Sequence, residues 1–321
     1  MPGCHRPIRS YIVPMELLGE LAALSTALLW AFTSIFFSAA GRRIGSFNVN
    51  KIRLLMAVAI YCLVLWATTG RLWSPDLTTN QLMWLALSGL IGLVFGDSCL
   101  FKAFVMIGPR LATLIYATTP IMTTAIAWIF LGETLGLYSL LGVALTIGGI
   151  TWVVLERRYD NGNNLAKDHP DSGSLIKGVI LGLGGALGQA VGLVLAKQAM
   201  IGDGADLAPM EASFLRMVAA LVAIWGMTLF SGHMRTTLIA MSDKKAMGHC
   251  TGGSIVGPFL GVWLSLVAIK LIPTGIAATL NSMVPVVIIP LVVIIHKEKV
   301  SLRAILGAII SVAGVALLML S

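Results

Sequence analysis

The sequence predicts an all-α integral membrane protein with ten transmembrane helices that form two inverted five-helix repeats. Three observations support this prediction: the composition, a series of ten apolar segments and an internal repeat. Hydrophobic residues make up 57% of the 321 residues, whereas charged residues make up only 11%. A soluble domain carries about 25% charged residues. The composition therefore excludes an ordinary cytosolic enzyme, a disordered chain and a secreted disulfide scaffold.

The second observation is the series of ten apolar segments, which short connections join. A helix that crosses the hydrocarbon core needs about 20 mainly apolar residues. Segments of about this length are 17–39, 52–69, 82–106, 111–131, 137–155, 176–199, 208–230, 251–271, 275–295 and 301–320. Because lipid offers the backbone no hydrogen-bond partners, each segment is expected to be a helix. The segments are too long, and alternate too little, for the strands of a membrane barrel.

The first segment is expected to remain in the protein. Arg6 and Arg9 precede it, as basic residues precede a signal peptide, but its apolar stretch exceeds the roughly 7–15 residues of a signal core. Residues 1–14 are polar and lie outside the repeat, so Met15 is an alternative start. The four cysteines are scattered, without metal-site spacing, so we predict no structural disulfide, no metal site and no cofactor.

The third observation is an internal repeat on either side of a hydrophilic stretch. The stretch 156–174 is rich in charged residues, Asn and Gly and is typical of a linker. It separates a predicted first repeat, 16–155, from a second, 175–320. Matching positions follow one another in the same order and at a nearly constant separation: Arg53 with Arg216, Pro109 with Pro273, Pro120 with Pro285, Glu133 with Glu298, Gly142 with Gly307, and Gly149 with Gly314.

Five segments in each repeat make the two copies enter the membrane from opposite sides, because an odd number of crossings reverses the direction of the chain. Inverted repeats are typical of secondary transporters, whose solute site lies near the middle of the membrane between the repeats. The architecture therefore predicts alternating access, and it leaves the solute open.

These positions resemble those of the EamA family, within the drug/metabolite transporter superfamily. The resemblance covers about residues 16–320. It rests on Trp30, on Pro120 followed by Leu131-Gly132-Glu133, on Gly142 and Gly149, and on the second-half positions Pro285, Glu298, Gly307 and Gly314. The halves differ where Lys297 replaces Gly132 and Gln189 replaces Trp30. The resemblance implies a ten-helix, multi-pass permease of the cell membrane that carries amino acids or related metabolites, often in the export direction.

Two prolines inside predicted helices mark candidate kinks. Proline removes one helical hydrogen bond and frees the carbonyl four residues earlier. Pro120 would free the carbonyl of Tyr116, and Pro285 that of Asn281, at equivalent positions. One interpretation is a pair of kinked helices that line a central cavity and present Tyr116, Asn281 and Ser282 to a solute. The other is two kinks that packing and nearby hydroxyls satisfy.

Three further side chains are candidate solute contacts. Trp30 lies near the middle of the first segment, and Gln189 is its counterpart in the sixth. A deep indole stacks on a ring or attracts a cation through its face, unless it simply belongs to the core. Trp263, in the eighth segment, is a similar candidate.

Asp97 lies well inside the third segment. An unpaired charge there costs about 2.5–3.5 kcal/mol on insertion scales. Two hypotheses remain open: Asp97 binds a proton or another coupling ion, or it is a structural residue paired with Lys102 or Arg53. Lys102 lies five residues on, roughly 140° around a helix, so the two do not share a face. The second repeat has Gly261 near this position, so Asp97 is not part of a symmetric site.

Charges near the segment ends are expected to be mainly structural. Arg53 and Arg216 each precede an apolar helix body. Binding of an anionic group is one interpretation, and snorkelling towards the membrane surface is the favoured one. Glu211 is a candidate partner for Arg216. Glu133 and Glu298 lie in predicted tight turns, which favours a structural role.

Two stripes of glycine at a spacing of four residues predict close helix contacts within lipid. They are Gly184, Gly188 and Gly192 in the sixth segment, and Gly253, Gly257 and Gly261 in the eighth.

The sequence therefore predicts a secondary active transporter of small organic metabolites, with an amino-acid or metabolite exporter as the first interpretation and proton coupling as a hypothesis. Carriers of nucleosides, sugars or organic cations remain alternatives, as does a channel or receptor. The sequence contains no HExxH helix, paired intramembrane carboxylates or Ser–His arrangement, so we predict no enzyme. The expected partners are the lipid bilayer, a small-molecule solute and protons, without nucleic acid; a homo-oligomer is a further hypothesis.

Basic residues predict the orientation. An even number of segments places both termini on one side of the membrane. Fifteen Lys and Arg residues fall near one set of connections, and five fall on the side of the termini. Because basic connections favour the cytoplasm, the termini are expected outside it.

Overall fold

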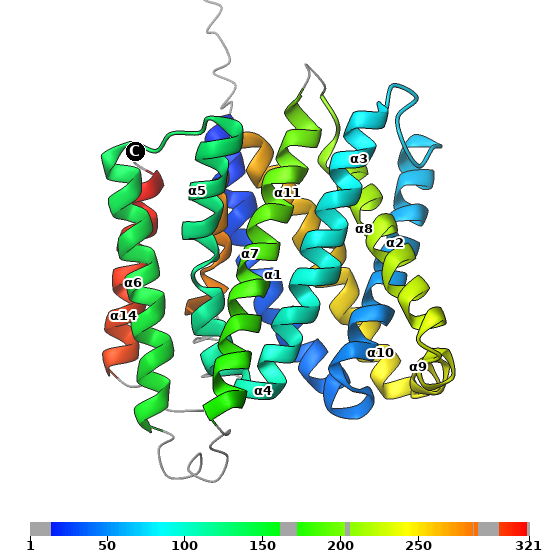
Figure 1. Cartoon of the computed structure of the whole chain (residues 1–321). Helices are drawn as coiled ribbons and strands as arrows, with labels where there is room; N and C mark the ends of the chain where they lie inside the picture. The colour runs from blue at the N-terminus through cyan, green and yellow to red at the C-terminus, as the bar shows by residue number, and fades with distance from the viewer. Residues whose placement is uncertain (1–13, 161–171, 203–205, 285, 288–301, 320–321) are drawn as a thin grey trace, which may run out of the picture.

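A computed structural model describes residues 14–160, 172–202, 206–284, 286–287 and 302–319. This part of the chain forms a bundle of helices and contains no strand (Figure 1). Its helices and two π-helical segments, η1 and η3, are α1 (Met15–Ile44), α2 (Ser46–Thr69), α3 (Thr79–Ser88), η1 (Gly89–Gly96), α4 (Asp97–Tyr116), α5 (Thr119–Leu131), α6 (Leu137–Asp160), α7 (Ser172–Ile201), α8 (Pro209–Phe230), α9 (Met234–Met241), α10 (Lys244–Ser254), η3 (Ile255–Gly261), α11 (Val262–Leu271), α12 (Thr274–Asn281) and α14 (Leu302–Met319).

Several of these helices are long and apolar enough to cross a membrane. The six longest of this kind cover 15–44, 46–69, 79–103, 175–201, 209–230 and 244–271. Shorter apolar helices cover 119–131, 137–152 and 305–317. The prediction of an all-α architecture with membrane-spanning helices is confirmed for the described residues, whereas they do not establish the count of ten.

The observed boundaries differ from the predicted ones at three places. Helix α4 continues through the predicted break after residue 106 and ends at Tyr116. Helices α6 and α7 extend into the predicted linker 156–174 from either side. In the predicted span 275–295, α12 ends at Asn281, and residues 288–295 lie outside the described part of the chain.

The chain breaks before Pro120 instead of kinking there. Pro120 lies in the first turn of α5, where its missing N–H removes no helical bond. The hydroxyl of Thr119 donates to the carbonyl of Tyr116 at 2.6 Å. The predicted kink is therefore wrong at Pro120, because a new helix starts there and the Tyr116 carbonyl is satisfied. Its counterpart Pro285 lies outside the described residues.

Two π-helical segments recur at equivalent positions. Segment η1 links α3 to α4, and η3 links α10 to α11. Both end on a glycine, Gly96 in η1 and Gly261 in η3. π-Helical turns are rare and occur frequently at functional sites. The sequence pattern did not predict them.

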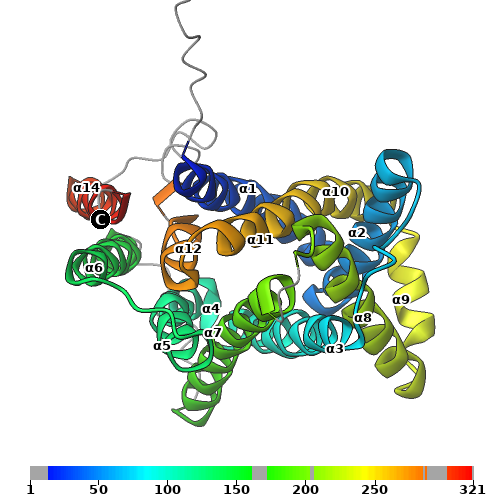
Figure 2. The same cartoon turned by 90° about the horizontal axis from the view of Figure 1, so that it is seen from above.

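Each π segment packs against a helix from the other half of the sequence. Helix α7 lies along α3, η1 and α4, and α1 lies along α10, η3 and α11 (Figure 2). A Cβ atom added to Gly188 would lie 2.7 Å from the Cα of Gly96. One added to Gly257 would lie 2.6 Å from the hydroxyl of Thr33. The prediction that the glycine stripes permit close helix contacts is confirmed.

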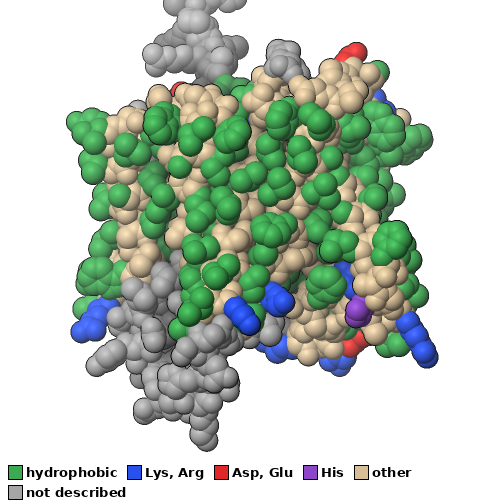
Figure 3. Space-filling model, viewed as in Figure 1, with side chains coloured by type: hydrophobic (Ala, Val, Ile, Leu, Met, Phe, Trp, Pro, Cys, Tyr) green, Lys and Arg blue, Asp and Glu red, His purple; other side chains and the backbone are tan. Residues whose placement is uncertain are grey.

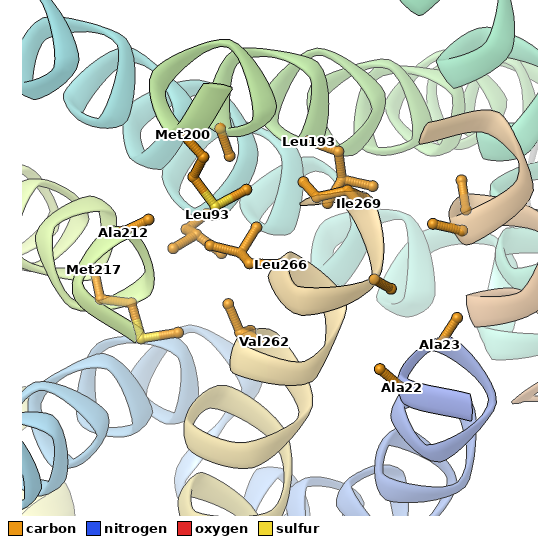
Figure 4. Packing of buried hydrophobic residues seen from close by; sticks show 14 of the residues in the cluster. Ala22, Ala23, Leu93, Leu193, Met200, Ala212, Met217, Val262, Leu266 and Ile269 are labelled. Atoms are coloured by element: carbon orange, nitrogen blue, oxygen red, sulfur yellow. The ribbon is translucent and has the colours of Figure 1, made fainter. Parts of the chain in front are cut away.

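The buried apolar core also joins the two halves. Figure 4 shows Leu93 of η1 and Met200 of α7 beside Leu266 of α11, with Ala22 of α1 on another side of the cluster.

Helices α6 and α14 form a separate pair (Figure 2). Gly149 and Gly314 lie in that contact, where a Cβ added to either would lie 2.5 Å from a backbone N of the opposite helix. Close packing of small residues is the usual means by which helices associate in lipid.

Basic side chains gather at one edge of the bundle. On the face in view, Lys and Arg lie along the lower edge of Figure 3. The described ends of the chain, at the start of α1 and the end of α14, lie at the upper edge (Figure 1). On this face, the basic edge and the described termini therefore lie at opposite ends of the bundle.

Asp243 ties two helices together at the basic edge. Its carboxylate accepts from the backbone N–H of Ala246 at 3.0 Å and so caps α10. It also forms an ion pair with Arg43, at the end of α1, at 2.8 Å. These contacts, led by the backbone N–H of Ala246, lower the pKa of Asp243. The capped and paired form is therefore the ionised one.

Candidate functional site

A buried ion pair joins α2 to the start of α4. The guanidinium of Arg53 donates through Nη2 to Oδ2 of Asp97. The Arg53 side chain is only 2% exposed and that of Asp97 is 14% exposed. Of the two partners considered for Asp97, the structure selects Arg53. The favoured expectation that Arg53 snorkels to the surface is wrong, because its charge is satisfied inside the bundle.

Further contacts hold the Arg53 guanidinium in place. Its Nε donates to Oδ1 of Asn50, one turn earlier in α2, at 2.8 Å. Its Cζ lies 5.2 Å from the ring centroid of Phe101 and 5.9 Å from that of Phe37. Both distances are typical of cation–π contacts. The amide Nδ2 of Asn50 is buried and has no hydrogen-bond partner, so this polar cluster retains an unused donor.

Arg216 of α8, the repeat counterpart of Arg53, lies within electrostatic range of Asp97. It is also 2% exposed, so snorkelling is the wrong expectation here too. A Cβ added to Gly92 of η1 would lie 3.2 Å from its Nη2. Among the described residues, the ion pairs do not include Arg216 with Glu211, so that predicted pair is wrong. The side chain is held by packing against η1.

Tyr116 and Asn281, the two predicted solute contacts, have different surroundings. Tyr116 lies within electrostatic range of Asp97 and Arg53. The amide of Asn281 donates through Nδ2 to Oγ of Ser265 in α11 at 3.1 Å. Its Oδ1 is buried without a hydrogen-bond partner. The hydroxyl of Ser282 donates to Ala278 of its own helix at 2.9 Å, as the structural interpretation expected.

Trp30 and Gln189 occupy matching places in the two cross-packed groups of helices. Nε1 of Trp30 lies 3.2 Å from a Cβ added to Gly261, the last residue of η3. The backbone N of Gln189 lies 3.3 Å from a Cβ added to Gly96, the last residue of η1. Trp30 and Trp263 both pack against the buried apolar cluster. Part of each indole ring therefore belongs to the apolar core.

A second cluster of polar residues connects the end of α5, helix α7 and the start of α12. The sequence analysis identified only one of its members, Glu133. Glu133 accepts from the backbone N–H of Thr274 at 2.6 Å and from its hydroxyl at 2.9 Å. Nζ of Lys197 lies 2.6 Å from Oε1 of Glu133 and donates to the carbonyl of Ile272 at 2.9 Å. We call Glu133, Lys197 and Thr274 the latch. Its counterpart Glu298, and the divergent Lys297, lie outside the described residues.

One signal in the sequence pointed to the latch. Lys197 lies inside the predicted span 176–199, and a charge within a membrane helix calls for a partner. Glu133 was expected to be structural, and its role at the start of α12 agrees with that. A neighbouring pair, Lys270 and Asp206 at 2.5 Å, ties α11 to the segment before α8. The hydrogen bond from Lys270 lowers the pKa of Asp206.

Comparison with known proteins identifies the family. The model of the EamA-like transporter family matches residues 17–155 and again residues 176–320. A solved structure titled only "Crystal structure of protein" shares the fold, with a TM-score of 0.67, 18% identity, and coverage of 93% of this chain and 94% of the other. No curated protein sequence matches the chain. With two matches that together span most of its length, the chain belongs to the EamA-like transporter family, whose members are membrane transporters of the drug/metabolite superfamily.

Proposed function

We propose that the protein is a secondary active transporter of small organic metabolites and works by alternating access between two inverted repeats. One observation carries the proposal: buried polar residues of both sequence halves meet at equivalent positions, Arg53 in α2 and Arg216 in α8, around Asp97. Polar groups inside a membrane protein are costly and usually mark a solute or ion path. The family makes amino acids and related metabolites the first solutes to test, in the export direction, at the cell membrane.

The cross-packed helices suggest which parts move together. Helix α1 is held against α10, η3 and α11, and α7 against α3, η1 and α4, through contacts at glycines. Each group combines a helix of one half with helices of the other. We propose that these two groups rock against each other as nearly rigid bodies, as inverted repeats do in other transporters. The contacts of the latch would then have to break when the two groups of helices separate at the end of the bundle where the latch lies.

Tyr116 and Asn281 are proposed as solute contacts, with Trp30, Gln189, Ser282 and Trp263 as further lining residues. The unpartnered Oδ1 of Asn281 supports this proposal, because a buried acceptor without a donor is destabilising unless a ligand or water satisfies it.

Substitution of Tyr116 and Asn281 tests the proposed site. A thermal-shift and uptake screen of amino acids, nucleosides, sugars and organic cations first identifies the solute. Tyr116→Phe and Asn281→Ala are then each expected to weaken binding about tenfold, since one lost hydrogen bond to a buried group is worth about 1–3 kcal/mol. Tyr138→Phe is the matched control, because Tyr138 is 67% exposed. Wild-type affinity in both variants would contradict the proposed contacts.

Exchange measurements distinguish a carrier from a channel. In proteoliposomes, unlabelled solute on one side is expected to accelerate the movement of labelled solute from the other. A channel gives no such acceleration, and its absence for every transported solute would contradict alternating access.

Asp97 is proposed as the proton-coupling residue. Its carboxyl group is paired with Arg53 inside the bundle, and protonation would have to release that pair. Asp97→Asn is therefore expected to abolish the response of transport to an imposed proton gradient while solute exchange at equal pH persists. An unchanged response to the gradient would exclude this role.

A further inference from the structure

The polar cluster around Asp97 contains more positive than negative charge. Arg53 and Arg216 contribute two buried guanidinium groups, and Asp97 contributes one carboxylate. Asp97 is paired with Arg53, whereas it interacts with Arg216 only at longer range. Among the described residues Arg216 forms no ion pair. Within this cluster, one positive charge therefore has no ion-pair partner among the described residues.

The hydrogen bonds of Arg216 are incomplete as well. Its Nε is fully buried and has no hydrogen-bond partner. An arginine does not relieve such a position by losing its proton, and an uncompensated buried charge is strongly destabilising. An arginine retained in this state points to a partner that is not part of the polypeptide.

The internal repeat supplies a comparison for this position. The partners of Arg53 are Asn50 and Asp97. In the second repeat, Ser213 lies three residues before Arg216, as Asn50 lies three residues before Arg53. Val262 directly follows η3, as Asp97 directly follows η1. The carboxylate is thus absent from the second repeat, and the Ser213 hydroxyl donates to the carbonyl of Pro209 at 2.8 Å. Among the described residues, Arg53 therefore has an ion pair and a hydrogen bond at Nε, whereas Arg216 has no ion pair and its Nε has no hydrogen-bond partner.

The chemistry of the Arg216 side chain suits a planar anion. Its Nη2 packs closely against η1, where a Cβ added to Gly92 would lie 3.2 Å from it. Tyr61 also interacts electrostatically with Arg216. Its hydroxyl keeps its proton and donates it to the carbonyl of Phe259 at 2.7 Å, so Tyr61 does not supply the negative charge that Arg216 lacks. A guanidinium presents parallel N–H groups in a rigid fork that matches a carboxylate in two-point contact.

We propose that Arg216 binds the carboxylate of the transported solute, so that the substrates of this transporter are organic acids or amino acids with a free carboxylate. The inference rests on the proposed transport function, because a residue that is 2% exposed is reached only in another conformation. The solute carboxylate takes the place at Arg216 that Asp97 occupies at Arg53.

Matched pairs of probes test the chemistry. The full-length protein in lipid nanodiscs is titrated with the proteinogenic amino acids, acetate, benzoate and succinate, each beside its amide, and with sodium chloride and sodium phosphate. We expect stabilisation by the carboxylate member of at least one pair and none by its amide. No response to any carboxylate, or a response to chloride or phosphate that carboxylates do not exceed, would overturn the proposal.

Variants of Arg216 separate binding from a structural role. Arg216→Met is expected to lower carboxylate affinity at least tenfold and to leave the melting temperature of the solute-free protein unchanged or higher. Arg216→Lys keeps the positive charge but loses the two parallel N–H groups of the guanidinium. Its carboxylate affinity is expected to lie between those of the wild-type protein and Arg216→Met. The control Lys102→Met removes an equal but exposed charge from α4 and is expected to keep wild-type affinity. A loss of stability in solute-free Arg216→Met equal to that of Arg53→Met would overturn the proposal.

The outcomes distinguish this inference from the proposed function. If a neutral or cationic solute shows accelerated exchange that persists in Arg216→Met, the transport function stands and the carboxylate assignment is wrong. If carboxylates bind in an Arg216-dependent manner but no solute shows accelerated exchange, the assignment stands and alternating access is wrong.

Discussion

Arg53→Met is expected to lower the free energy of unfolding by about 3–5 kcal/mol, the usual effect of breaking a buried ion pair from one side. The substitution leaves Asp97 in the bundle with the longer-range attraction of Arg216 in place of its ion pair. It also removes the bond to Asn50 and the contacts with the rings of Phe101 and Phe37. Equilibrium unfolding in mixed detergent micelles measures the change.

The double variant Arg53→Met/Asp97→Leu identifies the cause. Because it removes both charges, it is expected to recover most of the lost stability. Arg235→Met, at an exposed position in α9, is the control and is expected to remain within about 0.5 kcal/mol of the parent protein. A double variant as unstable as Arg53→Met alone would mean that packing of the long side chain, not the ion pair, accounts for the effect.

The two arginines show how far the sequence predicts this site. The alignment of the two halves identified Arg53 and Arg216 as equivalent, and the depth of Asp97 in its segment identified it as unusual. Helical geometry argued against Lys102 as its partner, and the structure selects Arg53. Sequence spacing did not reveal that both arginines are buried, because burial depends on neighbouring helices that are distant in sequence.

The π-helical segments, and the partners of Lys197 in the latch, could not be predicted from the sequence for a related reason. Segments η1 and η3 lie in stretches with the apolar composition of ordinary helix, which does not distinguish a π-helix from an α-helix; Pro258, inside η3, is the one irregularity in this pattern. Glu133 and Thr274 are separated by 141 residues. Their contact depends on the packing of α5 against α12, which local patterns do not specify. What the sequence did specify was the apolar helices, their glycine contacts and the equivalence of the halves.

Glu133→Gln in the latch is expected to speed amide hydrogen exchange at the start of α12. Glu133→Gln keeps the shape of the side chain and removes its charge. Lys197, whose side chain is 8% exposed, then keeps neutral acceptors, the carbonyl of Ile272 and the amide oxygen of the substituted side chain, but loses the carboxylate. The start of α12 loses a charge-assisted cap. Since such hydrogen bonds contribute about 1.5–3 kcal/mol, amide hydrogen exchange at residues 274–279 is expected to become about ten- to a hundredfold faster through local opening.

Two variants relate this opening to transport. Thr274→Val keeps the backbone N–H that bonds to Glu133 and removes only the hydroxyl, so its exchange is expected to rise less than that of Glu133→Gln. Glu16→Gln, exposed in the first turn of α1, is expected to change neither exchange nor transport. If the latch holds one end of the bundle closed, Glu133→Gln also shifts the transporter towards the state open at that end, and solute has readier access from that side. Faster amide exchange without altered access would confine Glu133 to capping α12, and the gate would then have to lie elsewhere between the two cross-packed groups of helices.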